Sequence, residues 1–253
     1  MNVTTWNVNS VRARLDRLTT WLDARAPDVV CLQELKCVDG ELPRAALEAR
    51  GYHVEAYGQK TYNGVAILSR SPITDVERRL PWPEDDQARG IAGTVNGVRI
   101  VNLYVVNGQA LGSDKYTYKL DWLSRLAARL TGQDLAHTVV CGDFNIAPAD
   151  ADVYDPAAWK DDILCSPPER AALQALVDLG LTDALRAVHP TGPYFTWWDY
   201  RGNMFEQQKG LRIDHHLIGN ALRARLIDVT VDSDERGQPQ ASDHAPVTMH
   251  LRD

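Results

Sequence analysis

Carboxylates stand at the ends of apolar segments of this chain, in a pattern suited to divalent-metal chemistry. Glu34 closes the apolar run 28–33, and Asp143 closes the run 138–142. The segment Ser242-Asp243-His244 places another carboxylate beside an imidazole. Mg²⁺ takes oxygen ligands, usually one or two carboxylates together with waters and substrate phosphate. The pattern therefore predicts a phosphodiesterase that works with a hard divalent cation.

Two amide side chains accompany these acids. Asn7 ends the first strand-like segment, and Asn145 follows Asp143 by two residues. Each amide could hold a phosphoryl oxygen, orient a water or fix a carboxylate, although turn or cap chemistry explains a single amide as well. A lone acid is likewise more often a solvated turn residue than a ligand. The recurrence of such positions in one chain favours the functional interpretation.

An acid and an imidazole form a second candidate unit. Asp214 lies between Ile213 and His215, in the middle of a predicted strand. A carboxylate inside an apolar segment is costly unless it is paired. His244 is the expected partner, because a carboxylate fixes the tautomer of an imidazole and can hold it protonated.

The elements that must position these residues are short strands and a few amphipathic helices. Apolar spacing predicts helices over 10–25, with Ser10 as N-cap, and over 42–50, 113–131 and 168–179. Asn96-Gly97 between two apolar runs indicates a hairpin. Two packed sheets with helices on their outer faces fit this order better than a doubly wound sheet. The strands are expected at 2–8, 28–32, 52–57, 64–69, 73–79, 91–96, 98–106, 137–142, 194–198, 211–218, 225–231 and 245–251.

Composition is that of an ordinary globular protein, with 44% hydrophobic and 24% charged residues among 253. No apolar stretch approaches the ~20 residues that span a bilayer, and the opening residues read as a strand and not as a signal peptide. Cys31, Cys37, Cys141 and Cys165 form no metal-binding spacing, so we expect reduced core thiols in a cytoplasmic protein. The net charge of −7 weighs against binding nucleic acid by bulk electrostatics, although it leaves room for a local basic face.

Several segments, taken together, resemble the signatures of the exonuclease III family, the AP endonucleases of the endonuclease/exonuclease/phosphatase superfamily. The resemblance runs from residue 2 to about residue 250, and the stretch 59–64 and the helix start 115–120 narrow it to exonuclease III-like proteins. The carrying segments are 6–13, 32–36, 59–69, 142–145, 210–214 and 242–246.

The resemblance implies an α/β fold, a four-layered sandwich of two packed mixed β-sheets flanked by helices, in a single catalytic domain of residues 1–253. It implies hydrolysis of the DNA backbone 5′ to abasic sites with a 3′-hydroxyl product, together with 3′-to-5′ exonuclease and 3′-end cleaning activity. Mg²⁺ is the expected cofactor, with Mn²⁺ as a substitute. The expected partner is double-stranded DNA with abasic sites or blocked 3′ ends, bound by a monomer without a membrane.

Two rival functions remain open. A less specific deoxyribonuclease or another phosphoesterase of the same superfamily is the first, and a DNA-lesion-binding protein with weak catalysis is the second. The complete set of acids, amides and imidazole argues against the second.

The resemblance also assigns roles residue by residue. The metal is expected at Glu34, with Asn7 and Asp243 beside it. Asp143 would activate the attacking water, although a phenolate of Tyr104 competes for that role. Asn145 would orient the water or hold phosphate, and Asp214 with His244 would stabilise the charge that develops on the phosphoryl group. The substrate would meet Asn107, Trp197, Leu211, Ile213 and Arg201.

Three further features qualify these roles. The aromatic run 195–200 must partly pack the core, whatever it contributes to a sugar pocket. Val106 replaces the proline usual in the loop of Tyr104 and Asn107, which would loosen that loop. A narrow basic patch is expected to lead DNA binding, formed by Lys60, Lys115, Lys119, Arg201, Lys209 and Arg212.

Overall fold

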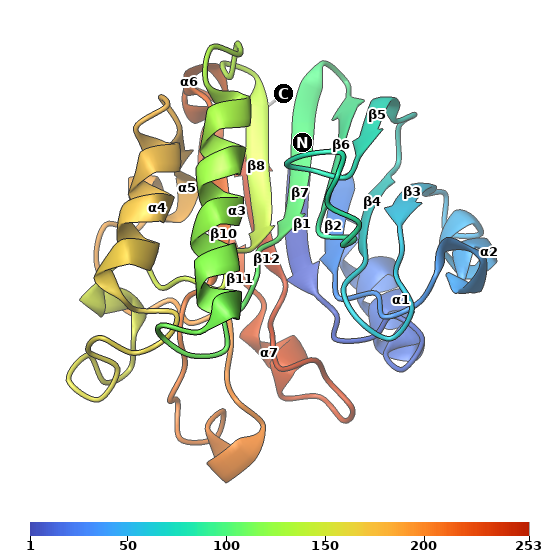
Figure 1. The fold of residues 1–253 in the computed structure, drawn as a ribbon. Coiled ribbons are helices and arrows are strands. Elements are labelled where there is room, and N and C mark those ends of the chain that lie inside the picture. The colour runs from blue at the N-terminus through green and yellow to red at the C-terminus, as the bar shows by residue number, and fades with distance from the viewer. Residues whose placement is uncertain (253) are drawn as a thin grey trace.

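The computed structural model describes residues 1–252, which form two six-stranded sheets packed face to face (Figure 1). The first sheet has the order β11-β12-β1-β2-β4-β3, and the second β5-β6-β7-β8-β10-β9. The first contains Asn2–Asn7 (β1), Val29–Gln33 (β2), His53–Tyr57 (β3), Val65–Ser69 (β4), Leu226–Val231 (β11) and Val247–Leu251 (β12). The second contains Thr74–Arg78 (β5), Gly90–Val95 (β6), Val98–Tyr104 (β7), Thr138–Asp143 (β8), Thr182–Asp183 (β9) and Asp214–Ile218 (β10).

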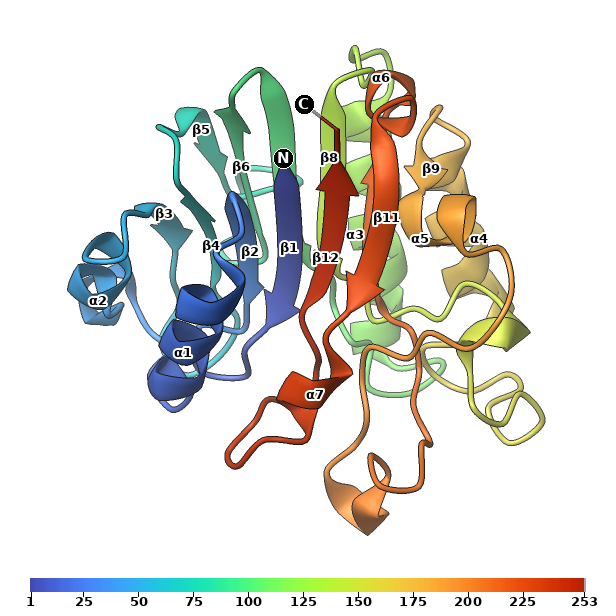
Figure 2. The ribbon, with the colours of Figure 1, turned by 180° about the vertical axis from the view of Figure 1, so that it is seen from behind.

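Helices cover the outer face of each sheet, which gives four layers. Leu15–Arg25 (α1) and Arg44–Glu48 (α2) lie on the first sheet, and Asp114–Leu130 (α3) and Pro167–Val177 (α4) on the second (Figures 1 and 2). Apolar side chains of both sheets form the central core, and Trp122, Leu123 and Leu126 of α3 belong to the core beneath the helices. The predicted fold class is confirmed. The shorter helices are Ala184–Val188 (α5), Asn220–Arg223 (α6) and Ser233–Arg236 (α7).

The strand register brings chain ends together at one edge of the sandwich. β1 and β2 run parallel, with Asn7 opposite Gln33, and β7 and β8 run parallel, with Tyr104 opposite Asp143. β10 is antiparallel to β8, so its first residue, Asp214, pairs with Asp143. The carboxyl ends of β1, β2, β7 and β8 and the start of β10 therefore deliver the candidate side chains.

Three predicted elements differ in the structure. Residues 194–198 form only isolated bridges, from Trp197 to Leu211 and to His244. Strand β10 begins at Asp214 and not at residue 211, so this carboxylate starts the strand instead of lying within it. Ser10 is not the N-cap of α1. It begins a turn in which its carbonyl accepts from the amide of Arg14, and α1 begins only at Leu15. Within residues 1–252 no helix is both long and apolar enough to cross a membrane.

Candidate active site

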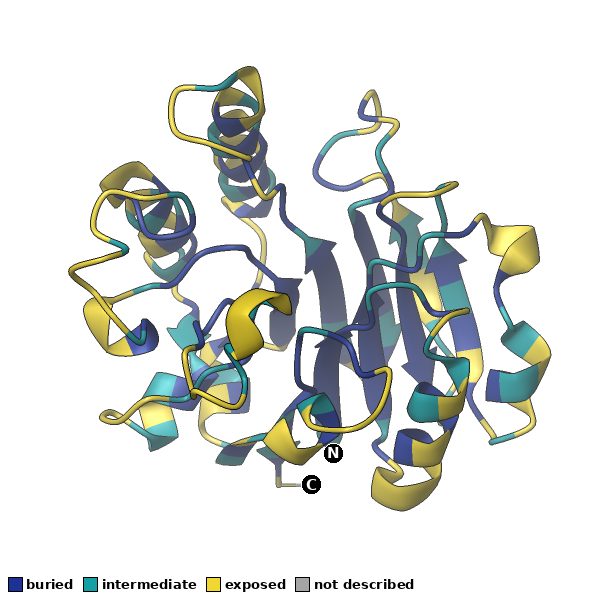
Figure 3. Cartoon of the chain, turned by 90° about the horizontal axis from the view of Figure 1, so that it is seen from below, coloured by how far each residue is buried: buried dark blue, intermediate teal, exposed yellow. Residues whose placement is uncertain are grey.

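The candidate site lies at the edge of the sandwich where the central strands end, which Figure 3 views from below. The strand ends are buried there, and exposed loops surround them. Close approach of β7 and β8 requires Gly142, since its φ is +142° and an added Cβ would lie 1.9 Å from the carbonyl oxygen of Leu103. Any larger residue next to Asp143 would push these two strands apart.

One amide joins two of the predicted acids. Asn7 Nδ2 donates to Glu34 Oε1 at 2.8 Å and to Asp143 Oδ2 at 2.9 Å. The hydroxyl of Tyr104 donates to the same Glu34 oxygen at 2.9 Å. Four residues, each at or just past the end of a different strand, thus meet through direct hydrogen bonds.

The predicted acid–imidazole pair is present. His244 Nδ1 lies 2.9 Å from Asp214 Oδ2, and its Nε2 faces Asp143 Oδ2 at 3.7 Å. Thr196, which sequence reasoning missed, donates its hydroxyl to Asp214 Oδ2 at 2.6 Å. A hydroxyl next to a tryptophan-rich run carries no distinctive pattern of its own, so only the fold could have revealed it.

Burial and mutual charge shift the pKa values of this group. Burial raises the pKa of Asp143, and Asp214 adds to that rise while His244 opposes it. Burial alone would lower the pKa of His244, but Asp214 and Asp143 outweigh it and raise the pKa. We infer that this imidazole is held as a cation between two carboxylates.

Three ligand atoms of Asp143, Asp214 and His244 lie within 4.8 Å of one another, a spacing that could also hold a metal ion. An imidazole ligates metals only in its neutral form. Because the neighbouring carboxylates favour the cation at His244, a metal ion bound by this cluster would have to displace that proton.

The loop after β8 is held by Asn145. Its backbone N–H donates to Asp143 Oδ1 at 2.9 Å, and its Nδ2 donates to the carbonyl of Val105 at 3.0 Å. Asn107 Nδ2 in turn donates to Asn145 Oδ1 at 3.0 Å. Val106 is 4% exposed, so it packs inward, and the loop that was expected to be loosened is tied down by these bonds.

Asp243 contacts a different set of residues from Glu34. Trp197 Nε1 donates to its Oδ2 at 3.0 Å, and Asn9 Nδ2 donates to its Oδ1 at 2.9 Å. Lys36 Nζ then bridges Asn9 Oδ1, at 2.6 Å, and Glu34 Oε2, at 2.9 Å. A chain of polar contacts therefore links the two predicted metal-binding acids.

Asn9 and Lys36 were not predicted as site residues. Each follows a strand end by a short step, and both have positive φ, +45° and +54°. Left-handed backbone at non-glycine residues is uncommon and concentrates at functional sites. The sequence offers one weak signal, because each lies two residues beyond a predicted site residue, Asn7 or Glu34.

The three predicted pocket residues differ in exposure. Trp197 is partly exposed, whereas Leu211 and Ile213 are 0% and 1% exposed and belong to a buried apolar cluster. Contact of these two side chains with a sugar stays a prediction and would require their neighbours to move apart. Arg201 is well exposed and pairs with Asp199 at 2.5 Å.

The predicted basic patch is smaller than expected. Lys119 and Arg212 are 0% and 1% exposed and pair with buried acids, so neither can meet DNA directly. The expectation was wrong because a cation within an otherwise polar segment looks the same whether it is solvated or paired inside the fold. The remaining exposed members are Lys60, Lys115, Arg201 and Lys209.

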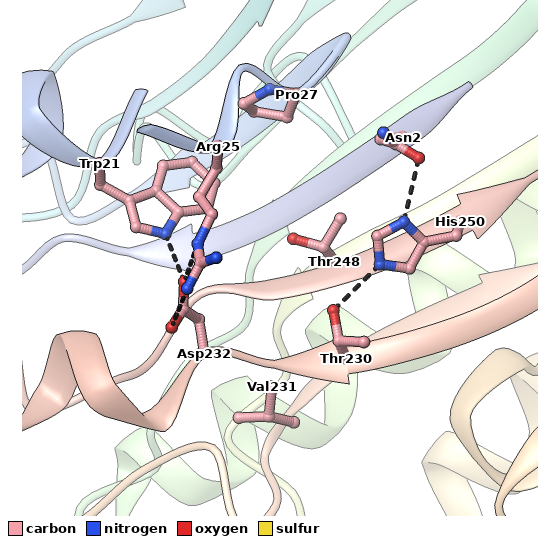
Figure 4. Close-up of a pocket in the computed structure, with 9 residues that line it drawn as sticks. All are labelled: Asn2, Trp21, Arg25, Pro27, Thr230, Val231, Asp232, Thr248 and His250. Atoms are coloured by element: carbon pink, nitrogen blue, oxygen red, sulfur yellow. Dashed lines mark hydrogen bonds and ion pairs between the residues drawn. The ribbon is translucent and has the colours of Figure 1, made fainter. Parts of the chain in front are cut away.

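A separate hollow of about 340 Å³ lies on the outer face of the first sheet, beside α1 (Figure 4). Its polar side chains satisfy one another, since Trp21 donates to Asp232 at 2.9 Å and the His250 ring contacts Asn2 and Thr230 at 3.0 Å each. None of the predicted site residues lines it, and we assign it no role.

Comparison with known proteins decides the family. The Endonuclease/Exonuclease/phosphatase family matches residues 4–244. Exodeoxyribonuclease III of Haemophilus influenzae is 34% identical over the full length of both chains. The chain belongs to the exonuclease III family. It is therefore a nuclease, as the motifs of its sequence predict.

Two solved structures are similar to this chain throughout their length. A 3′ phosphatase from Neisseria, solved with a product DNA hairpin, is 51% identical with a TM-score of 0.98, and each chain is covered fully. An AP endonuclease from Archaeoglobus fulgidus is 36% identical with a TM-score of 0.96, and 99% of each chain is covered.

Proposed function

We propose that this nuclease hydrolyses, with Mg²⁺, the DNA backbone 5′ to abasic sites and cleans blocked 3′ ends. The observation that carries the proposal is the bond from one amide, Asn7 Nδ2, to both Glu34 and Asp143. In this proposal Glu34 binds the metal and Asp143, on the same amide, activates the water. The relatives from Neisseria and Archaeoglobus, a 3′ phosphatase and an AP endonuclease, support the two substrate types.

The donor set fits a hard cation. Glu34 and Asp243 offer carboxylate oxygens and Asn7 an amide oxygen, the ligand types that Mg²⁺ prefers. Lys36 Nζ pairs with Glu34 Oε2 at 2.9 Å, so the metal would bind at the other Glu34 oxygen or displace this ammonium. These three residues would hold the metal, which when bound would polarise a phosphoryl oxygen and assist the leaving group.

The chain's own side chains supply the rest of the chemistry. Asp143 accepts the proton of the attacking water, help that is worth roughly 10²–10⁴-fold in rate. Asn145 orients that water or the phosphate, from a loop that its own bonds to Val105 and Asp143 hold. His244, fixed by Asp214, presents Nε2 to the negative charge that grows on the phosphoryl oxygens.

Tyr104 is the competing base, and its geometry favours another role. Its hydroxyl donates to Glu34, and loss of that proton would place a phenolate beside a carboxylate. We assign Tyr104 to phosphate contact. A comparison of pH–rate profiles separates the two candidates for the base. Asp143→Asn should lose nearly all activity, whereas Tyr104→Phe should keep the pH dependence of the wild-type rate. Near-normal rates for Asp143→Asn would exclude our assignment.

The protein is proposed to act as one catalytic domain and as a monomer on double-stranded DNA, since one chain supplies every residue named. Its four cysteines are free and buried, which supports a reducing, cytoplasmic location.

The deciding assay offers equal amounts of abasic duplex, 3′-phosphate duplex, intact duplex and a small phosphomonoester. Preference for the first two supports the proposal, and equal cleavage of intact duplex would favour a less specific deoxyribonuclease.

A further inference from the structure

A buried ion pair lies directly beneath the active-site loops. Lys119 of α3 and Glu169 of α4 form it, and both are 0% exposed. Burial of an unpaired charge is costly, so such a pair persists only when further hydrogen bonds satisfy both groups. The ammonium and the carboxylate both meet that condition here, and their partners lead to the site.

The Lys119 ammonium has three acceptors for its three protons. Besides the Glu169 carboxylate, it donates to the carbonyl of Asn145 at 2.7 Å and to the carbonyl of Asn107 at 3.1 Å. Those carbonyls belong to the two loops whose side chains bond to each other at 3.0 Å. One cation therefore fixes the main chain of both loops, while their side-chain amides bond to each other.

The Glu169 carboxylate is anchored from the other side. It accepts the amides of Leu164 and Ser166, each at 3.1 Å, and the Ser166 hydroxyl at 2.6 Å. That hydroxyl also bonds to the hydroxyl of Tyr116 on α3 at 2.7 Å. The carboxylate thus ties α3, α4 and the segment before α4 into one rigid support.

Backbone conformation adds a second reason for this support. Asn145 has φ of +51°, a left-handed conformation that costs free energy in a non-glycine residue. Gly108 has φ of +93° and lies over the Lys119 stem, so that a Cβ on it would meet Cδ at 3.2 Å. The loop of Asn145 therefore carries a backbone cost, and the stem of Lys119 packs closely against the loop of Asn107.

We propose that Lys119, with Glu169, is a positioning residue of the nuclease that fixes Asn107 and Asn145 at the scissile phosphate. The inference rests on the roles proposed above for these two amides. Lys119 acts through their main chain and touches neither substrate nor metal. Small displacement of a positioned group can lower a rate about a hundredfold, which sets the size of the expected effect.

The test compares Lys119→Met with the double variant Lys119→Met/Glu169→Gln. The single variant leaves a buried carboxylate unpaired and should lose both stability and activity. The double variant removes both charges and should recover the melting temperature, since a buried pair replaced as a whole is often neutral. Its kcat should stay about tenfold to a hundredfold low, with KM changed little.

Leu126→Ala is the matched control, because Leu126 is a buried core residue on the same helix. It should lower the melting temperature and keep kcat. Recovery of kcat together with stability in the double variant would overturn the proposal, as would an equal loss of kcat in Leu126→Ala.

Amide hydrogen exchange tests, without an activity assay, whether Lys119 holds the two loops in place. The amides of Asn145 and Gln109, which bond to side chains of their own loops, should exchange faster in the double variant, while those in the middle of α3 should not change. If the wild-type protein cleaves no DNA, the proposed function fails and exchange alone decides. Unchanged exchange at both loop amides would then overturn the proposed positioning role of Lys119.

Discussion

His244 and Asp214 form a buried ion pair, with Nδ1 and Oδ2 2.9 Å apart, at the point where two sheets meet. Isolated bridges join Trp197 to His244 and to Leu211, and so bring together the two chain segments that carry the pair. The hydroxyl of Thr196 also donates to the Asp214 carboxylate. The other ring nitrogen faces Asp143 at 3.7 Å. A fixed cation is therefore aimed at the carboxylate that we assign to water activation.

Removing either member of this pair should disable the same function. We expect Asp214→Asn and His244→Gln each to lower kcat by about 10²-fold or more, because the imidazole loses its orientation or its charge. The double variant should be no worse than the poorer single variant, since the two residues act as a unit. Multiplicative losses in a double-mutant cycle would contradict this.

Metal dependence should follow Glu34. EDTA should abolish cleavage, and added Mg²⁺ or Mn²⁺ should restore it. Glu34→Gln should shift the Mg²⁺ concentration for half-maximal rate upward by about tenfold or more, because a neutral amide replaces the carboxylate that we propose as the main metal ligand. The shift should also appear in metal-dependent thermal stability. Glu55→Gln, on β3 and paired with Arg78, is the control and should leave the metal response unchanged.

Trp197→Phe tests the link between the substrate pocket and the metal. Phenylalanine keeps an aromatic face but cannot donate to Asp243, so we expect weaker Mg²⁺ binding, by about tenfold, with little change in substrate KM. Trp198→Phe is the matched control, because its buried Nε1 has no hydrogen-bond partner within residues 1–252. Equal metal affinity in both variants would show that the Trp197 bond does not hold Asp243.

Acid stability should reveal the buried network of Arg212 and Asp152, whose Nε and Oδ1 are 2.7 Å apart. Burial alone would raise the pKa of Asp152, but bonds and charge from Arg212 and Arg186 outweigh it and lower the pKa. A depressed native pKa stabilises the fold above the unfolded value of about 3.9. That contribution is lost as pH falls through the native pKa.

Asp152→Asn should accordingly cost about 1.5–3 kcal/mol near pH 7, because Arg212 loses the Asp152 carboxylate and keeps that of Asp183. The difference from wild type should begin to narrow below about pH 4, where the carboxylate of the unfolded chain takes up a proton, and should vanish only once the pH has fallen through the lower native pKa. Denaturant unfolding at pH 7, 4 and 3 measures both. Asp23→Asn, which breaks the exposed pair with Arg50, should show little effect at any pH.

The salt dependence of the DNA-binding constant should reflect only a few contacts between protein cations and DNA phosphates. With Lys119 and Arg212 buried, each exposed cation of the patch matters more, and Lys209→Gln should reduce the slope of log K against log salt by about 1. Arg70→Gln removes an equal charge at the opposite end of the sheet and should leave the slope unchanged. A slope that neither variant alters would argue against phosphate-led binding by this patch.

The sequence predicted the sandwich and the gathering of its acids well, for a physical reason. Buried strands read as continuous apolar runs, so Glu34 and Asp143 could be placed at strand ends. Asp214 was predicted in the middle of a strand, which is wrong, because Leu211 before it forms only isolated bridges and β10 begins at Asp214 itself. Lys119 looked like a solvated cation, since burial of a charge depends on partners far along the chain, here Glu169, 50 residues away.

The most direct test maps the products from an abasic duplex and a 3′-phosphate duplex, for wild type and Asp143→Asn, with Mg²⁺ and with EDTA. We expect wild type, with Mg²⁺ only, to nick the strand 5′ to the abasic site with a 3′-hydroxyl and to release phosphate from the blocked end. Unchanged products with EDTA, or from Asp143→Asn at the wild-type rate, would contradict this expectation.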